Sequence, residues 1–455
     1  MNRRSYAALV LLPIAIACKE SYSIAEPTGE LALDTQLRQT IGIWGAVPLL
    51  PVAEQNPALV ELGRSLFFDK ILSGNRDVAC ATCHNPTASA GDALALPIGT
   101  GGTGVGITRT LGHGRQFVPR NAPSLLNQGL GFFYLFWDGS VNEEGGLGRF
   151  KTPAGVILPS GLTNLLAAQA MLPVLNRHEM RGQPGDMDVT GGPNELAAIS
   201  DATPHDVWNA AMKRLLAIQE YQAKFNAAFP GTPASALGFQ HAANAIAAFE
   251  VAAFTRQNSP FDRFLHGDNR AMTADEKRGA ILFFGRARCS TCHSGALLGG
   301  QDFANIGVPQ IGPGVGDAAP LDIGRGADLP QIPQYRFAFR VQPLRNVELT
   351  APYMHNGAYP TLEAVVRHYN HADSAHRNYD PSNLPATLRT MYHGDDATKQ
   401  SVLETLDFRI REPLRLTDGE QRQLVAFLES LTDPAARNLS SVVPTRVPSG
   451  LSVRH

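Results

Sequence analysis

The stretch Cys80-Ala81-Thr82-Cys83-His84 has the form C-x-x-C-H, and the same form recurs at Cys289-Ser290-Thr291-Cys292-His293. This spacing lets the two thiols of one motif add to the two vinyl groups of a haem, while the adjacent histidine reaches the iron as proximal ligand. A four-thiolate zinc site and two redox dithiols are the alternatives, but neither explains why a histidine follows each pair. The sequence therefore predicts two covalent c-type haems.

Similar segments precede the two motifs. Gly63–Phe68 reads GRSLFF, and Gly279–Phe284 reads GAILFF. Each closes a short predicted helix, one opened by Asn56-Pro57 and the other by the capping box from Thr273 to Glu276. We interpret them as two copies of one helical unit, one per domain.

Length and composition agree with two folded domains. The chain has 455 residues, 44% of them apolar and 18% charged, which excludes wholesale disorder. Its net charge of -2 provides no electrostatic surface for nucleic acid. Further helices are expected from Pro204 to Phe229, from Ser235 to Phe254 and after Thr417, so the fold class is mainly α with long loops.

The first residues have the pattern of an export signal. A basic start is followed by an apolar run that ends at Cys18, and the run is too short to span a membrane. Residues 1–18 are therefore expected to be a signal peptide, with lipidation of Cys18 and a periplasmic location, and ordinary cleavage nearby is the alternative. Residues 19–45 are expected to be a tether.

The domain boundary is expected near Asn258-Ser259-Pro260. The N-terminal haem domain then covers residues 46–257 and the C-terminal haem domain covers residues 258–434. Residues 435–455 carry no pattern and are expected to form a loose tail.

Beyond the haem motifs, the chain resembles the bacterial di-haem cytochrome c peroxidase family, which includes the MauG-like enzymes. The resemblance covers roughly Pro48 to Leu431, and it implies two cytochrome c-like helical domains, each with one haem. It is carried by blocks in the family's order: Leu62–Asp69, Gly112–Gly114, Pro119–Ser124, Phe136–Gly139, Asn258–Arg263, Asp322–Arg325, Pro343–Val347 and Leu349–Gly357.

The resemblance places the peroxide site at the N-terminal haem, on His84. It implies that Glu179 is the distal acid–base group, with Pro173 in the same pocket, and that His113 is a gate that caps the iron at rest. It also implies that Trp137 lies between the haems and relays electrons. The alternatives are a surface glutamate, a solvent-facing loop histidine and a core tryptophan.

For the C-terminal haem, on His293, the resemblance implies a second axial ligand at Tyr369. The typical peroxidases have methionine there, whereas the MauG-like enzymes have tyrosine. Phenolate is a hard donor that favours ferric iron, and thioether favours ferrous iron. Met354 and His368 are the alternative ligands in the sequence, and an iron with no protein ligand at this position is the remaining alternative.

The family also has a calcium site between its domains. The resemblance implies that Asn121, Thr350 and Pro352 hold Ca²⁺ here through an amide oxygen and two backbone carbonyls, with waters completing the shell.

Two segments stand apart from the family pattern. An insertion around residues 145–165 lies between Trp137 and Glu179, and we expect it near the peroxide pocket. The run Gly99–Gly104 is similar to a dinucleotide-binding loop but follows no strand, so we interpret it as a mobile loop.

The leading functional interpretation is an enzyme, a cytochrome c peroxidase. It reduces hydrogen peroxide to water with electrons from a small cytochrome c or cupredoxin that docks near the C-terminal haem, and a homodimer is expected from the family. The second interpretation is a MauG-like oxidase that draws electrons from a partner protein, and Tyr369 favours it. A non-catalytic di-haem electron carrier is the third.

Overall fold

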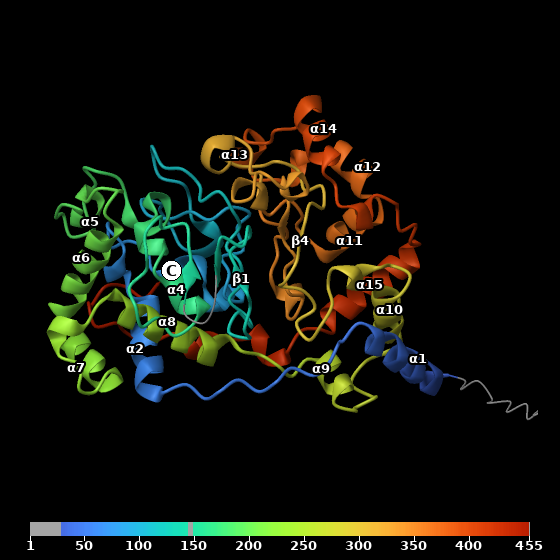
Figure 1. Ribbon diagram of the computed structural model, residues 1–455, viewed down its shortest axis with the longest axis horizontal. Helices are drawn as coiled ribbons and strands as arrows, with labels where there is room; N and C mark the ends of the chain where they lie inside the picture. Colours follow the sequence, from blue (N-terminus) through green and yellow to red (C-terminus); the bar gives the residue numbers. More distant parts are fainter. Residues whose placement is uncertain (1–28, 144–148, 455) are drawn as a thin grey trace, which may run out of the picture.

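The computed structural model describes residues 29–143 and 149–454, which form two lobes. The first lobe lies on the left of Figure 1. Its elements are α2 (Pro57–Phe68), α3 (Cys80–Cys83), α4 (Leu165–Ala170), α5 (Glu195–Ala198), α6 (Pro204–Leu216), α7 (Gln219–Ala228), α8 (Phe239–Phe254) and the antiparallel sheet of β1 (Tyr134–Leu135), β2 (Val141–Glu143) and β3 (Phe150–Lys151).

The second lobe holds the remaining helices and one antiparallel strand pair. Its elements are α1 (Glu30–Ile43), α9 (Pro260–Leu265), α10 (Ala274–Phe284), α11 (Leu362–Asn370), α12 (Ala372–Arg377), α13 (Ala386–Arg389), α14 (Asp396–Glu404), α15 (Asp418–Glu429), β4 (Phe303–Ala304) and β5 (Phe339–Arg340). The protein is therefore mainly helical, as predicted, with long loops and short 3₁₀ turns between the helices. No helix in the described ranges is long and apolar enough to cross a membrane.

The predicted helix starts are confirmed. Asn56 caps α2 with Pro57 at its first position, and Thr273 and Thr417 form capping boxes at α10 and α15. The helix expected over 204–229 is two helices, because the chain turns between Leu216 and Gln219. The helix expected from 235 begins at 239, after a 3₁₀ turn.

The two predicted copies of one helical unit share the same helix crossing: α2 crosses α8, and α10 crosses α15, each at a glycine. A Cβ at Gly63 would overlap the carbonyl oxygen of Ala245 on α8, and a Cβ at Gly279 would overlap that of Gln423 on α15. Glycine therefore allows α2 to pack directly on α8, and α10 on α15, at equivalent positions. This close crossing explains why glycine opens both GRSLFF and GAILFF.

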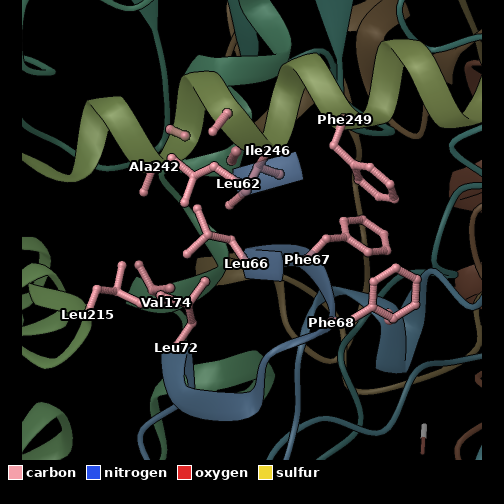
Figure 2. Packing of buried hydrophobic residues seen from close by; sticks show 14 of the residues in the cluster. Leu62, Leu66, Phe67, Phe68, Leu72, Val174, Leu215, Ala242, Ile246 and Phe249 are labelled. Atoms are coloured by element: carbon pink, nitrogen blue, oxygen red, sulfur yellow. The ribbon is translucent and has the colours of Figure 1, made fainter. Parts of the chain in front are cut away.

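Phenylalanines fill the space beside each crossing. In the first lobe, Phe67, Phe68 and Phe249 have ring centroids 5.1–6.0 Å apart and lie on the right of the cluster in Figure 2. In the second lobe, Phe283, Phe284 and Phe427 repeat the arrangement at 5.0–5.9 Å. The rings are tilted or edge-to-face, the geometry that aromatic pairs prefer.

The expected tether is wrong over the residues that the structure describes. Residues 30–43 form α1, which packs on α10 of the second lobe. Leu37 and Ile41 are buried one helical turn apart, and Asp34 pairs with buried Lys277 at 2.7 Å. Residues 19–28 lie outside the described ranges. The apolar i, i+4 spacing of α1 is the signal that the composition of this segment obscured.

The expected loose tail is also wrong. After α15 the chain returns to the first lobe, where its end lies in Figure 1. Leu439 and Val447 are 1% exposed in the first lobe's core, and Arg64 donates to the carbonyl of Val442 at 2.8 Å. Ser449 donates to Asp69. Backbone carbonyls and isolated apolar side chains hold the tail, so it has no periodic signal. The chain thus crosses between the lobes at both ends.

A buried ion pair joins the lobes near the middle of the molecule. Arg120 contacts Asp138 at 2.5 Å and Asp322 at 2.7 Å. Beside it, the backbone of Asn121 donates to the carbonyl of His355 at 2.7 Å. Removing one partner would leave a buried charge uncompensated, so this contact fixes the register between the lobes.

Candidate active site

The second C-x-x-C-H motif borders a large apolar cavity that is lined by residues of both lobes. Cys289, Cys292 and His293 all line it. The Nδ1 atom of His293 lies 3.1 Å from the carbonyl oxygen of Leu298, which can only accept, so Nδ1 carries the proton and Nε2 keeps a lone pair. Burial lowers the pKa of His293 to about 4, so the imidazole is neutral. These donors suit a haem with a histidine ligand.

Two of the three ligand candidates for the other side of this haem reach the cavity. Tyr369 and Met354 line it. Burial raises the pKa of Tyr369, and Met354 has a φ of 74°, in the left-handed region that side chains disfavour. His368 is engaged elsewhere: Nδ1 lies 2.8 Å from the Tyr359 hydroxyl and Nε2 lies 2.7 Å from the Ile306 carbonyl. With both nitrogens bonded, His368 has no lone pair left for iron.

The expected tryptophan and calcium residues lie on the wall of the same cavity. Trp137, Asn121, Thr350 and Pro352 all line it, although more than 200 residues separate the first two from the last two. The Trp137 indole donates to the Asn121 carbonyl at 2.8 Å. Within the described residues, no group of three or more His, Cys, Asp or Glu side chains is placed to hold a metal. Oxygen donors of amide and backbone type suit Ca²⁺.

The first motif lies in α3, which follows α2 in the first lobe. Burial raises the pKa of Cys80 to about 12 and lowers that of His84 to about 4. Both cysteines of this motif, Cys80 and Cys83, are unpaired, as are Cys289 and Cys292. Since the motifs occupy different lobes, they do not combine into one four-thiolate zinc site. Two free thiols followed by a neutral, desolvated histidine fit a second haem.

Glu179 lies in a single π-helical turn, Arg177–Arg181. Asn176 caps this turn, and its side-chain amide donates to Glu179 Oε1 at 3.1 Å. Burial alone raises the pKa of Glu179 to about 7. The negative charge of its carboxylate is one of the causes that raise the pKa of the Cys83 thiol. A π turn is often found at a functional site, where it redirects a side chain. The structure therefore places a weakly acidic carboxyl beside the first motif.

The glycine-rich run anchors this turn. The backbone N–H of Thr100 donates to the Glu179 carbonyl at 2.8 Å, and a Cβ at Gly99 would overlap the carbonyl of His178. The Thr100 side chain is buried and donates to Asp77 at 2.8 Å. The interpretation of this run as a mobile loop is therefore wrong for Gly99 and Thr100, because close packing needs glycine there.

His113 is the one candidate that the structure leaves in solvent. His113 is exposed, and the glycine that follows it, Gly114, has a φ of 71°. The loop is held by Arg115, which pairs with Asp186 at 2.7 Å, and by Gly112, which packs against Gly101. The structure therefore does not bring His113 into the pocket of Glu179.

The described part of the insertion packs on the first lobe's core, where Val156, Leu158 and Leu162 contact the cluster that contains Met180. Residues 144–148 are outside the described ranges. Thr163 and Gly161 bond to Asn244 on α8, at 2.8–3.1 Å, and Lys151 pairs with Asp328 of the second lobe at 3.1 Å. The described part of the insertion therefore braces α8 and the lobe interface.

Two buried carboxyl groups beside the first motif were missed. Burial raises the pKa of Asp92 to about 7 and that of Glu250, on α8, to about 8. The charge of Asp92 helps to raise the pKa of Cys83, and the charge of Glu250 helps to raise that of Cys80. Among the described residues, Asp92 Oδ2 and Glu250 Oε2 have no hydrogen-bond partner. No spacing in the sequence links them to the motif, because only the fold brings them there.

Comparison with known proteins agrees with this arrangement. A model of the di-haem cytochrome c peroxidase family matches residues 57–270. The methylamine utilization protein MauG of Methylorubrum extorquens is 30% identical over 385 residues, which cover 84% of this chain and 81% of that one. Cytochrome c551 peroxidase of Pseudomonas aeruginosa is 33% identical over 321 residues, which cover 70% and 72%.

A solved structure extends the likeness to three dimensions. The crystal structure of a MauG-like protein associated with microbial copper homeostasis superposes with a TM-score of 0.56 and 25% identity, covering 86% of this chain and 95% of that one. Together with the two cysteine motifs and the cavity around His293, these likenesses establish the assignment. The chain belongs to the di-haem cytochrome c peroxidase family, and it is an oxidoreductase.

Proposed function

We propose that this protein is a periplasmic di-haem peroxidase that reduces hydrogen peroxide to water. The observation that carries the proposal is Glu179, a desolvated carboxyl beside the first motif whose pKa is raised to about 7. A group with this pKa near neutral pH both accepts and returns a proton with little cost. Peroxide reduction needs such a group, because one oxygen must lose its proton and the leaving oxygen must gain one.

The residues of the two motifs would hold the haems. Cys80 and Cys83 would bind one haem covalently and Cys289 and Cys292 the other, with His84 and His293 as proximal ligands. When bound, haem supplies an iron that takes up peroxide and changes its oxidation state. The protein's part at the first motif is proton transfer by Glu179 and exclusion of water by the packed loop at Gly99.

His113 is proposed as the gate of the first haem. It lies in an exposed loop between Gly112, which packs against Gly101, and Gly114, where an added Cβ would meet nothing within 4 Å. Such a loop has room to bring the imidazole towards the pocket in one redox state and to leave it in solvent in the other. The exposed position in this structure corresponds to the open arrangement in this proposal.

Electrons are proposed to arrive at the second lobe and to pass Trp137. Arg288 is exposed and also lines the cavity of the second motif, so it marks the mouth of that cavity. Phe408, between the cavity residues Asp407 and Arg409, is 76% exposed. An exposed aromatic side chain beside a cavity mouth suits docking of a small cytochrome c or cupredoxin.

A MauG-like activity, in which a partner protein is oxidised, is the second candidate. The observation that favours it is Tyr369, which lines the cavity with no hydrogen-bond partner among the described residues. As a phenolate ligand, it would favour the oxidised states of the haem. The relatives include both a MauG protein and peroxidases.

The test is to add hydrogen peroxide to the purified di-haem protein and to follow the Soret and visible bands. It is done on the fully ferric form and again after one-electron reduction. Reaction of the half-reduced form alone supports the gated peroxidase. Reaction of the fully ferric form with both haem spectra changing together supports the MauG-like candidate. Reaction of neither form overturns both in favour of an electron carrier.

Two further assignments belong to this proposal. Calcium at Asn121, Thr350 and Pro352 would link the lobes, since these residues come from both halves of the chain. Chelation followed by readdition of Ca²⁺ tests it through the haem spectra. Export with lipidation at Cys18 is tested by mass spectrometry of the mature N-terminus.

A further inference from the structure

A line of aromatic side chains runs from the cavity of the second motif to the protein surface. It starts at Tyr369, whose ring centroid lies 5.8 Å from that of His368. His368 is 5.0 Å from Tyr359, Tyr359 is 5.7 Å from Tyr379, and Tyr379 is 5.5 Å from Tyr392. Three phenols and an imidazole thus follow Tyr369 without a gap.

Tyr359, the phenol that follows His368 in this line, is hydrogen-bonded to that histidine. Because the Ile306 carbonyl can only accept, Nε2 of His368 carries the proton, and Nδ1 accepts the hydrogen bond from the Tyr359 hydroxyl at 2.8 Å. The hydrogen bond therefore fixes the Tyr359 ring between His368 and Tyr379.

The last phenols connect this pair to solvent. The Tyr379 hydroxyl donates to the Ala358 carbonyl at 2.8 Å, which fixes its ring between Tyr359 and Tyr392. Tyr392 is only half-buried, and its hydroxyl makes no hydrogen bond within the described ranges. A Cβ at Gly394 would overlap the Tyr392 ring, so glycine leaves room for this ring at the surface.

We propose that Tyr392 is a surface one-electron oxidation site, connected through Tyr379, Tyr359 and His368 to the haem cavity, and that it draws electrons from phenolic reductants. This rests on the peroxide reduction proposed above. One hydrogen peroxide takes up two electrons and two protons and gives two waters. Tyr392 supplies these two electrons one at a time. Each electron leaves along the line as one proton leaves the Tyr392 phenol, and a phenolic reductant restores Tyr392 in between.

The protons have defined places in this step. Tyr379 and Tyr359 lie between Tyr392 and His368, and each keeps its own hydroxyl proton once the electron has passed. The proton of Tyr392 leaves to solvent. A phenolic reductant at the surface then donates a hydrogen atom to Tyr392 and restores it.

The experiment uses the full di-haem protein with peroxide, no reductant and the nitrone trap DMPO. Mass spectrometry locates the trapped radicals, and freeze-quench electron paramagnetic resonance records the tyrosyl signal. We expect a DMPO adduct on Tyr392 in the wild type. Tyr379→Phe retains Tyr392 but interrupts the line, so the adduct on Tyr392 should fall to the level without peroxide.

Tyr335→Phe is the matched control, since Tyr335 contacts Phe303 and lies off the line. It should retain the Tyr392 adduct. An unchanged adduct in Tyr379→Phe overturns the proposed line while the peroxidase proposal stands. So does the absence of any Tyr392 adduct in wild-type protein whose haem bands respond to peroxide. Haem bands that do not respond at all overturn both, because no oxidant is then available.

Discussion

The hydrogen bond between Tyr359 and His368 fixes which residue of α11 faces the second haem cavity. His368 is held away from the cavity by Tyr359 at 2.8 Å on one side and by Ile306 at 2.7 Å on the other. Consecutive residues on a helix point in different directions, so Tyr369 is turned towards the cavity. Of the three side chains considered as a second ligand for this haem, Tyr369 and Met354 line the cavity and His368 is bonded elsewhere. An iron with no protein ligand at this position is the remaining alternative.

Tyr369→Met should raise the reduction potential of the C-terminal haem. Thioether stabilises ferrous iron, whereas a phenolate stabilises ferric iron. Spectroelectrochemical titration of the two haems measures the change. Met354→Leu is the matched control and should leave the potential nearly unchanged. If instead Met354→Leu shifts the potential and Tyr369→Met does not, Met354 is the ligand.

Glu179→Gln should lower the rate of the peroxide reaction by about 10²- to 10⁴-fold, since a positioned proton carrier contributes on this scale. The reaction needs the carboxylate to accept the first proton, so the wild-type rate should rise with pH through about 7, the raised pKa of Glu179. The amide side chain of the variant does not titrate, and stopped-flow measurement across this range should show no such rise. Glu404→Gln, at an exposed position on α14, controls for surface charge. A wild-type profile retained in Glu179→Gln would remove Glu179 from the mechanism.

Gly63→Ala and Gly279→Ala should each destabilise the protein by about 1–3 kcal/mol, because the new methyl overlaps a backbone carbonyl of the crossing helix. Urea denaturation followed by circular dichroism measures the loss. Gly42→Ala is the control, since a Cβ there meets nothing within 4 Å. It should be neutral or slightly stabilising, as alanine is the better helix former. Equal stability of all three variants would contradict the proposed crossing.

Val447→Ala should cost about 2 kcal/mol, as expected for a fully buried aliphatic side chain cut back in a core. The change lies in the tail, so the result measures directly whether the tail is part of the first lobe. Ile157→Ala, at a site that is 89% exposed, should have almost no effect. Thermal unfolding of the holoprotein compares the two. No difference between them would show that the tail is loose in solution.

Glu250→Gln should stabilise the protein at alkaline pH. Burial raises the folded-state pKa of Glu250 from 4.5 to about 8, so the folded state holds a proton that the unfolded state releases. The contribution of Glu250 to the free energy of unfolding is fully present below pH 4.5 and is lost as the pH rises to about 8. At pH 8 the variant should be more stable by on the order of 1 kcal/mol or more. Melting temperatures at pH 5 and pH 8 measure this, and an equal difference at both would contradict it.

Most of the chemistry could be read from contiguous residues. The two C-x-x-C-H motifs, the capped helix starts at Asn56, Thr273 and Thr417, and the repeated glycine–phenylalanine segments are local patterns. Each follows from the geometry of a few neighbouring residues, so one sequence is enough to recognise it.

The tertiary structure decided what depends on contacts between distant residues. In the folded protein, α1 packs on the second lobe and the tail packs on the first. Both ring nitrogens of His368 are hydrogen-bonded there. The tertiary structure also placed Asp92 and Glu250 beside the first motif and aligned Tyr359, Tyr379 and Tyr392. The physical reason is common to all of these: burial, hydrogen-bond saturation and ring contacts are properties of space. The hydrogen-bonded partners Tyr359 and His368, His368 and Ile306, and Ser449 and Asp69 lie 9, 62 and 380 residues apart along the chain.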